Sequence, residues 1–270
     1  MRKRLKLEAM MNNPYRFLST SLLSLLLTST VQAHSQSDNV GRALYLTEEY
    51  PPANFILDGQ LTGSSVDVLH AAAKAVGEEI GSNRIVLQAW SDAYRTALTT
   101  PNTAVFSTTR TEHREDLFLW VGPISKVKVV VMAKRGRGIE VDSPLDMAKY
   151  RIGVVEDDIG EQLLLDLGIP RAAMIEVKDV GILAELLTKN RVDLIAYSEK
   201  TALWMASQSG IKSSTFQSVY TLQEGYTYYA FNKDSDPALI EKLQQGIDII
   251  KANTDENGVN QYQEILKKYQ

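Results

Sequence analysis

A polar stretch at residues 106–115, FSTTRTEHRE, carries residue types that can hold a small anion. Arg110 and Arg114 each offer paired N–H donors that match the two oxygens of a carboxylate. Hydroxyl groups and the free backbone N–H groups at the start of a helix can complete such a site. A second interpretation needs no ligand, because Thr111 followed by Glu112 also forms a partial cap for an exposed helix. The stretch alone leaves both interpretations open.

The segments around this stretch alternate between strand and helix patterns. Short apolar runs predict strands, and apolar residues at helical spacing predict helices. The predicted strands of this part are 42–47, 85–87 and 102–107, and its predicted helices are 66–76 and 90–98. Strands that alternate with helices are typical of a parallel or mixed sheet covered on both faces. We therefore predict an α/β fold.

A second α/β series follows the long β-branched run at residues 126–133, which a Gly-rich break at residues 135–138 interrupts. This break indicates a boundary between two parts of the chain. The predicted strands that follow are 151–155, 174–177, 191–197 and 226–231, and the predicted helices are 144–149, 160–167, 180–190, 199–207, one ending at 250, and 258–269. Sheets of this kind bind ligands at the carboxyl ends of their strands. The loops to inspect are therefore 48–55, 89–91, 107–114, 156–160 and 197–199.

The N-terminal 33 residues have the pattern of a secretory signal peptide. A basic start is followed by a Leu-rich apolar run at residues 17–30 and by small residues that end at Ala33. A membrane-anchored N-terminus is the alternative. The run is too short and too rich in Ser and Thr for a membrane span, so we expect a soluble, exported protein after cleavage.

The composition excludes several kinds of site. Removing residues 1–33 takes five basic residues and one acidic residue from totals of 29 and 33, so the rest carries a net charge of −8. A nucleic-acid partner is not expected, because phosphate binding needs a concentrated positive surface. The chain has no cysteine, which excludes disulfides, thiolate metal sites and a Cys nucleophile. Its three histidines show no metal-ligand spacing, so neither a metal nor another cofactor is expected.

Four groups of residues, taken together, resemble a known family. They are Tyr50-Pro51-Pro52 with Asp58-Gly59 and Val66-Asp67; Ser107-x-Thr109-x-Thr111-x-x-Arg114; Gly153-Val154-Val155 with Gly160; and Arg191-Val192-Asp193. Their order and spacing are similar to extracellular solute-binding protein family 3, the receptors that deliver amino acids to ABC importers. The resemblance covers the whole chain after the signal peptide.

The resemblance implies the type II periplasmic-binding-protein fold, with two α/β lobes joined by two crossing hinge strands. It implies a discontinuous first lobe, residues 34–128 and 223–270, and a second lobe, residues 129–222. A small polar solute, an amino acid or related carboxylate, would bind in the cleft between the lobes. Closure about the hinge would bury this solute and create the surface that an importer reads.

The resemblance also implies roles for residues of the first lobe. Arg114 would hold the α-carboxylate of the ligand, and Thr109 and Ser107 would be its neutral hydrogen-bonding partners. Tyr50 would form an aromatic wall of the site, and Trp90 lies one residue from a similar aromatic position.

Two interpretations of these first-lobe residues need no ligand. Arg114 could instead form a structural ion pair with Glu115 or Asp116. Tyr50 could simply pack in the core. Both alternatives stay open at the level of sequence.

The second-lobe side of the expected cleft departs from the family pattern. A turn that is usually rich in Gly, Ser or Thr is here EDDIG, from Glu156 to Gly160, and these two residues are its expected ligand contacts. Three carboxylates facing a cleft would favour a cation, whereas acids that point outward would only support the start of a helix. Ser198 stands where the family often has an acid for the ligand ammonium group. Thr47, with Glu48 beside it, stands where a first-lobe Asp is common.

The expected function is capture of a small polar solute and its delivery to the membrane subunits of an ABC importer. A periplasmic monomer without catalytic residues is expected. One alternative is an enzyme on the same scaffold, like cyclohexadienyl dehydratases, in which Glu156 or Asp157 would serve as the acid. Another is the ligand-sensing domain of a signalling system.

Overall fold

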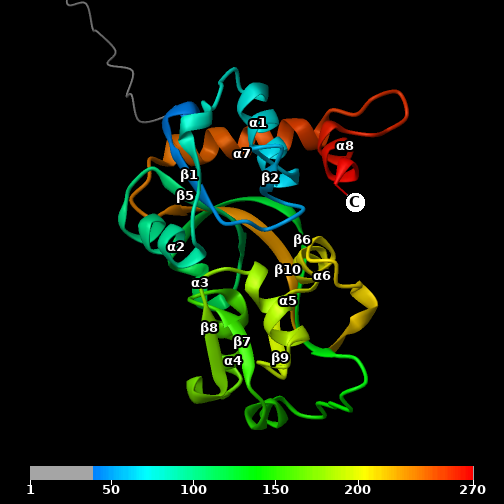
Figure 1. Ribbon diagram of the computed structural model, residues 1–270. Helices are drawn as coiled ribbons and strands as arrows, with labels where there is room; N and C mark the ends of the chain where they lie inside the picture. The colour runs from blue at the N-terminus through cyan, green and yellow to red at the C-terminus, as the bar shows by residue number, and fades with distance from the viewer. Residues whose placement is uncertain (1–38, 270) are drawn as a thin grey trace, which may run out of the picture. The chain divides into compact units, whose positions relative to one another are not determined.

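The computed structural model describes residues 39–269 of the chain (Figure 1). The predicted signal peptide, residues 1–33, lies outside the described residues. The strands are β1 (Leu44–Thr47), β2 (Phe55–Leu57), β3 (Gln60–Thr62), β4 (Ile85–Leu87), β5 (Thr103–Thr109), β6 (Phe118–Lys134), β7 (Ile152–Val155), β8 (Met174–Val177), β9 (Leu194–Ser198) and β10 (Phe216–Asn232). The α-helices are α1 (Ser64–Ala75), α2 (Trp90–Thr99), α3 (Glu112–Glu115), α4 (Ile159–Asp166), α5 (Gly181–Thr188), α6 (Glu199–Gln208), α7 (Pro237–Ala252) and α8 (Gln261–Lys268).

Eight of these strands form one mixed sheet in the order β4-β1-β5-β10-β6-β9-β7-β8. Strand β1 pairs in parallel with β4 and β5, and β7 pairs in parallel with β8 and β9. All seven residues of β5 are buried, as expected for a strand covered on both faces. The predicted α/β fold is therefore confirmed, with two parallel groups of strands, which we call the first and second lobes.

Strands β6 and β10 join the two lobes. Each is 17 residues long, and they pair with each other in antiparallel orientation over most of their length. Strand β10 also pairs with β5 of the first lobe, and β6 pairs with β9 of the second. In Figure 1 they run as long curved strands between the two groups of helices.

The sequence pattern predicted these joining strands too short, at residues 126–133 and 226–231. The β6–β10 ladder shifts its register between Thr227 and Tyr229, opposite Gly122 and Pro123. Proline cannot donate a hydrogen bond to a ladder, so a strand that tolerates it does so at an irregularity. Gly122 and Pro123 therefore interrupt the apolar sequence pattern, although strand β6 continues through them. The predicted lobe boundaries at 128/129 and 222/223 fall inside β6 and β10 and remain a prediction.

Each lobe has its own apolar core. In the first lobe, helices α1 and α7 lie side by side in Figure 1 and pack closely. Gly246 allows this approach, because a Cβ atom there would lie 2.2 Å from the backbone oxygen of Ala72. Another apolar cluster spans both lobes and includes Tyr50, Trp90 and Tyr197. Within residues 39–269, no helix combines the length and apolar character needed to cross a membrane.

Candidate ligand-binding site

The carboxyl ends of the strands in the first lobe face those of the second. Because β1 and β5 are parallel, Glu48 and Thr109 lie at the same edge of the sheet, and the same holds for Asp158 and Ser198 after β7 and β9. The two edges are in direct contact, since the hydroxyl of Tyr197 donates a hydrogen bond of 3.0 Å to Oε1 of Glu48. The loops expected to bind a ligand thus meet between the lobes.

The short helix α3 places Arg114 in the interior. Thr111 is its N-cap, and its hydroxyl accepts a hydrogen bond from the backbone N–H of Arg114, which confirms the predicted cap. Arg110 points to the surface, where it pairs with Glu115. The alternative of an ion pair between Arg114 and Glu115 is therefore wrong, because Arg110 takes that partner and Arg114 is fully buried.

Helix α2 places two aromatic rings against Arg114. Trp90 and Tyr94 are one helical turn apart, so they face the same side. Their ring centroids lie 5.2 Å and 5.1 Å from the guanidinium carbon. Such cation–π contacts stabilise a guanidinium that has lost its water.

Arg114 also has hydrogen-bonding partners across the gap between the lobes. Its Nε donates to Oε1 of Gln162 at 2.8 Å. Longer contacts of 3.4 and 3.5 Å join its Nη atoms to the backbone oxygens of Thr109 and Asp157. Burial lowers the pKa of the Arg114 guanidinium, and the negative charge of Asp158 is the strongest effect that opposes this. Arg114 is therefore an interlobe contact as well as a candidate anchor.

Asp158 is buried at the start of α4 and is only 4% exposed. Among the described residues, its Oδ2 is the one buried side-chain oxygen or nitrogen that has no hydrogen-bond partner. Burial raises the pKa of this carboxyl, while Arg114 and the backbone N–H groups of Ile159 and Gly160 lower it. Neither N–H closes a cap hydrogen bond of regular geometry. An unpartnered buried carboxylate oxygen is costly, so Asp158 lacks a donor that it needs.

Glu48 is the second buried acid of the site. Burial raises the pKa of its carboxyl well above the usual value, and the negative charge of Asp158 adds to this effect. The hydroxyl of Tyr197 and the charge of Arg114 act in the opposite direction on the pKa. We refer to Glu48, Arg114 and Asp158 as the buried charged cluster. Tyr50 meets Tyr197 edge to face, with ring centroids 5.7 Å apart, next to this cluster.

The other two acids of the EDDIG turn lie at the rim. An Nη atom of Arg95 lies 3.0 Å from Oε1 of Glu156 and 2.7 Å from Oδ2 of Asp157. Ser91 donates to Glu156 at 3.2 Å, and the indole N–H of Trp90 donates to the backbone oxygen of Asp157 at 2.9 Å. We refer to Arg95, Glu156 and Asp157 as the rim latch, because these contacts join helix α2 of the first lobe to the second lobe.

The chain belongs to the bacterial extracellular solute-binding proteins, family 3. The model of that family matches residues 44–270. No curated protein matches the chain. The matched residues include both lobes of this chain and the contacts between them that are described above.

Solved structures share the fold at low sequence identity. A histidine kinase sensor domain with similarity to periplasmic binding proteins has a TM-score of 0.71 at 18% identity, covering 84% of this chain and 96% of its own. An ancestral arginine-binding protein bound to arginine has a TM-score of 0.68 at 20% identity, covering 84% and 97%. The arginine-, lysine-, histidine-binding protein ArtJ from Geobacillus stearothermophilus has a TM-score of 0.66 at 18% identity, covering 84% and 95%.

The remaining predicted site residues of this family 3 protein have partners within their own lobes. Ser107 bonds to Asn54 and, at 2.9 Å, to Ser65. Gly160 lies against β9, where an added Cβ atom would be 2.3 Å from the backbone oxygen of Ala196. Ser198 is the N-cap of α6, and its side chain accepts from the N–H of Thr201. Their roles toward a ligand stay predictions.

Two residues that reach across the site were not predicted from the sequence. Gln162 lies one helical turn after Asp158, so both side chains share a face of α4 and point toward Arg114. Tyr197, the other residue, falls within the loop 197–199 that the sequence indicated, without a role of its own. The spacing of Gln162 from Asp158 was the signal that could have identified it.

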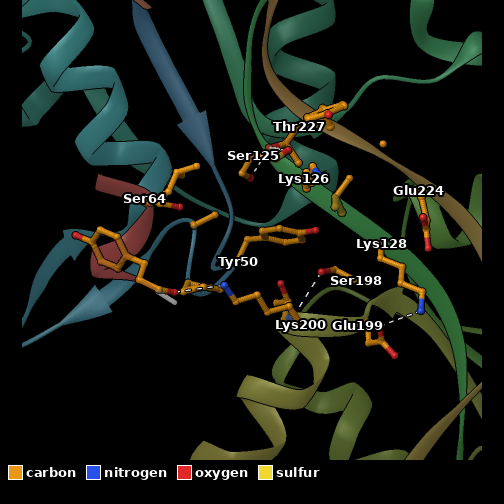
Figure 2. Close-up of a pocket in the computed structure, with 18 of the residues that line it drawn as sticks. Tyr50, Ser64, Ser125, Lys126, Lys128, Ser198, Glu199, Lys200, Glu224 and Thr227 are labelled. Carbon is orange, nitrogen blue, oxygen red and sulfur yellow. Dashed lines mark hydrogen bonds and ion pairs between the residues drawn. The ribbon is translucent and has the colours of Figure 1, made fainter. Parts of the chain in front are cut away.

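A cavity lies on the side of Tyr50 that faces the joining strands. Its volume is about 890 Å³, and we call it the hinge pocket. Figure 2 shows Tyr50 between Ser125 and Thr227 of the joining strands and Ser198 of the second lobe. Its lysines are partly engaged, since Lys128 lies 3.3 Å from Glu199. The candidate site of this family 3 protein thus combines the buried charged cluster with the open hinge pocket, and Tyr50 lies between the two.

Proposed function

We propose that this protein is a receptor that encloses a small polar solute between its lobes and hands it to an ABC importer. The observation that carries the proposal is the unpartnered Oδ2 of Asp158, which is buried where the two lobes meet. A buried polar atom without a partner calls for an explanation, such as strain, a bound water or ion, or a functional role. A solute that donates a hydrogen bond to this oxygen, released when the lobes separate, accounts for it.

Closure of the lobes fits this role. The rim latch and the hydrogen bond between Tyr197 and Glu48 form only when the lobes are together. An enclosed site of this kind holds its ligand away from water and presents a distinct surface to a membrane partner. Export through cleavage after Ala33 would bring the receptor to the periplasm, in line with the extracellular location of the family.

A sensory role is the second candidate. One of the similar structures is a sensor domain of a histidine kinase, so the same fold can report a ligand instead of delivering it. The binding chemistry would be the same in both cases. The two roles differ in the membrane partner, which co-purification with importer subunits or with a kinase would identify.

The enzyme alternative receives little support from the geometry of Glu156. Its hydrogen bond with Arg95 is the main reason that the pKa of this carboxyl is lowered. A general acid needs a raised pKa so that it holds a proton at neutral pH. A binding role without catalysis therefore explains Glu156 better.

The proposal is tested by thermal-shift screening of the purified protein against amino acids, polyamines and small carboxylates. A ligand at 100 times its Kd adds about 2.7 kcal/mol to the free energy of unfolding, which gives a clear shift. Tyr197→Phe removes the hydroxyl that bonds to Glu48 and is expected to reduce the ligand-induced shift. Tyr150→Phe, at the end of the 3-10 helix Pro144–Lys149, is the matched control and should leave it unchanged. Absence of any shift across the set would contradict the receptor role.

A further inference from the structure

The start of helix α4 and the guanidinium of Arg114 together form a place where an anion is favoured. The N-terminus of a helix carries a partial positive charge and free N–H donors. Arg114, fully buried, adds a full positive charge facing this helix, and it already bonds to Gln162 of α4. A ligand carboxylate would be the ordinary occupant of such a place.

In this chain, the side chain of Asp158 already lies there. Asp158 is the N-cap of α4, and among the neighbouring charges it contributes most to keeping Arg114 ionised. A ligand carboxylate that entered the same place would meet a buried carboxylate at close range. Like charges in a region of low polarity repel strongly, so binding of a carboxylate there is disfavoured.

The buried charged cluster also holds more acidic groups than basic ones. Arg114 is its basic group, whereas Glu48 and Asp158 are two carboxyl groups, all three within the interior. Among the described residues, no direct ion pair joins Arg114 to Asp158, although their charges attract each other. Oδ2 of Asp158 is therefore the atom of the cluster that is left to accept a hydrogen bond from a donor outside the chain.

The walls beside the cluster suit a cation. Tyr50 and Tyr197 are buried rings that adjoin Glu48, and the negative face of an aromatic ring attracts an ammonium or guanidinium group. Trp90 and Tyr94 are already engaged by Arg114. Two buried carboxyl groups and two aromatic rings thus lie close to one another at the start of α4 and the end of β1.

We propose that the ligand is an organic cation without a carboxylate group, whose amine or guanidinium donates to Oδ2 of Asp158 and to Glu48. This inference rests on the proposed receptor function and specifies the class of its solute. The carboxyl group of Asp158 supplies the negative charge beside Arg114 and the start of helix α4 that a ligand carboxylate would otherwise supply. Diamines and guanidino-alkyl amines are the compounds of this class.

Matched pairs of compounds test the inference by isothermal titration calorimetry on the purified protein. Agmatine and arginine differ only by a carboxylate, and so do cadaverine and lysine. We expect at least one amine to bind, and to bind about ten-fold or more tightly than its amino acid. Equal or tighter binding of the amino acids would overturn the inference.

A pair of isosteric variants locates the effect. Asp158→Asn keeps the shape of the side chain, and we expect it to weaken agmatine binding by about ten-fold without weakening arginine binding. Asp146→Asn, whose carboxylate contacts the exposed Lys149 in the 3-10 helix Pro144–Lys149, is the control and should change agmatine affinity by no more than about two-fold. Unchanged agmatine binding by Asp158→Asn would contradict the inference. The comparison of the compound pairs needs no variant, so it holds even if Asp158→Asn folds poorly.

The outcomes separate this inference from the receptor role. If a carboxylate-containing compound of the wider screen binds most tightly, the receptor role stands and the inference falls. If no compound of either set binds, both fall. If agmatine or cadaverine is preferred and Asp158→Asn removes the preference, both stand.

Discussion

Three consecutive acidic residues of this protein lie in two different surroundings. Glu156 and Asp157 belong to the rim latch, where both bond to Arg95, whose side chain is 54% exposed. Asp158, the next residue, belongs to the buried charged cluster and is 4% exposed. The carboxyl group of Asp157 is therefore in contact with water, whereas that of the adjacent Asp158 lies in the interior.

The difference shows that burial, more than residue type, decides what an acid does in this cleft. At the rim, the hydrogen bond with Arg95 lowers the pKa of Glu156, as in ordinary surface ion pairs. In the cluster, loss of water is the largest effect and raises the pKa of both Glu48 and Asp158. The rim acids hold the lobes together, whereas the buried acids require a partner.

The largest expected effect comes from removing the positive charge of the cluster. Arg114→Met leaves two buried carboxyl groups without their cation, which typically costs about 3–5 kcal/mol of the free energy of unfolding. Urea denaturation at neutral pH measures it. Arg110→Met is the control, because Arg110 pairs with Glu115 at the surface and its loss should matter far less. Equal losses in the two variants would refute the contrast between surface and cluster.

A smaller effect is expected from crowding the start of helix α4. In Gly160→Ala, the new Cβ atom would lie 2.3 Å from the backbone oxygen of Ala196, so the helix that carries Asp158 must shift. Overpacking of this kind costs about 1–3 kcal/mol, and ligand binding should weaken as well. Gly225→Ala is the control, since its Cβ atom would have only an ordinary contact of 3.6 Å with Gln223. The midpoints of urea denaturation of the two variants measure the difference. Equal midpoints for Gly160→Ala and Gly225→Ala would contradict tight packing between the start of α4 and β9.

The free energy of unfolding should depend on pH differently in the two regions, because the pKa of Glu48 is raised and that of Glu156 is lowered. Because the pKa of Glu48 is raised in the folded state by burial and by Asp158, folding takes up a proton between the ordinary Glu value and the raised one. The contribution of Glu48 to the free energy of unfolding therefore falls as pH rises through that window. Arg114 and Tyr197 lower the pKa of Glu48 and so reduce this effect. Glu48→Gln should gain stability relative to the unaltered protein when urea midpoints at pH 8 are compared with those at pH 5.

Glu156→Gln provides the matched measurement at the rim. The pKa of Glu156 is lowered, so its contribution is present above the ordinary Glu value and is lost as pH falls through the lowered one. Between pH 5 and 8, this variant should show no change relative to the unaltered protein. A relative gain at pH 8 as large as that of Glu48→Gln would show that the two acids do not differ.

The smallest effect on stability is expected from opening the rim latch. Arg95→Ala removes both ion pairs of an exposed side chain, so its urea midpoint should shift several-fold less than that of Arg114→Met. Its effect should appear instead in binding kinetics, as faster ligand release from lobes that separate more readily. Stopped-flow measurement of the dissociation rate checks this prediction. An unchanged rate would show that the rim latch does not slow ligand release.

Much of the fold was readable from local patterns. The strand β5 and the capped turn that follows it were predicted, whereas the role of Arg114 toward a ligand stays a prediction. Helix α2 was predicted at residues 90–98, whereas the contact of Trp90 and Tyr94 with Arg114 was not predicted. The joining strands were missed in part, because Gly122 and Pro123 interrupt the pattern of β6 without ending it.

The second-lobe half of the site was harder to predict for a physical reason. A run of three acids at the start of a helix has the same local signature whether its members face water or the interior. Only the contacts of α2 with the turn before α4 bring Asp157 to Arg95, and only the folded structure shows that Asp158 is buried. The partners of Arg114 are likewise distant in the chain, as its contact with Gln162 shows.

A crystal structure of the protein with the tightest-binding compound of the screen would test the central claim most directly. We predict a ligand nitrogen about 2.7–2.9 Å from Oδ2 of Asp158, the length of a charge-assisted hydrogen bond. Glu48 and Tyr50 would adjoin the same group. A ligand carboxylate bound to Arg114, or a ligand held only in the hinge pocket with Oδ2 of Asp158 still unpartnered, would contradict the account.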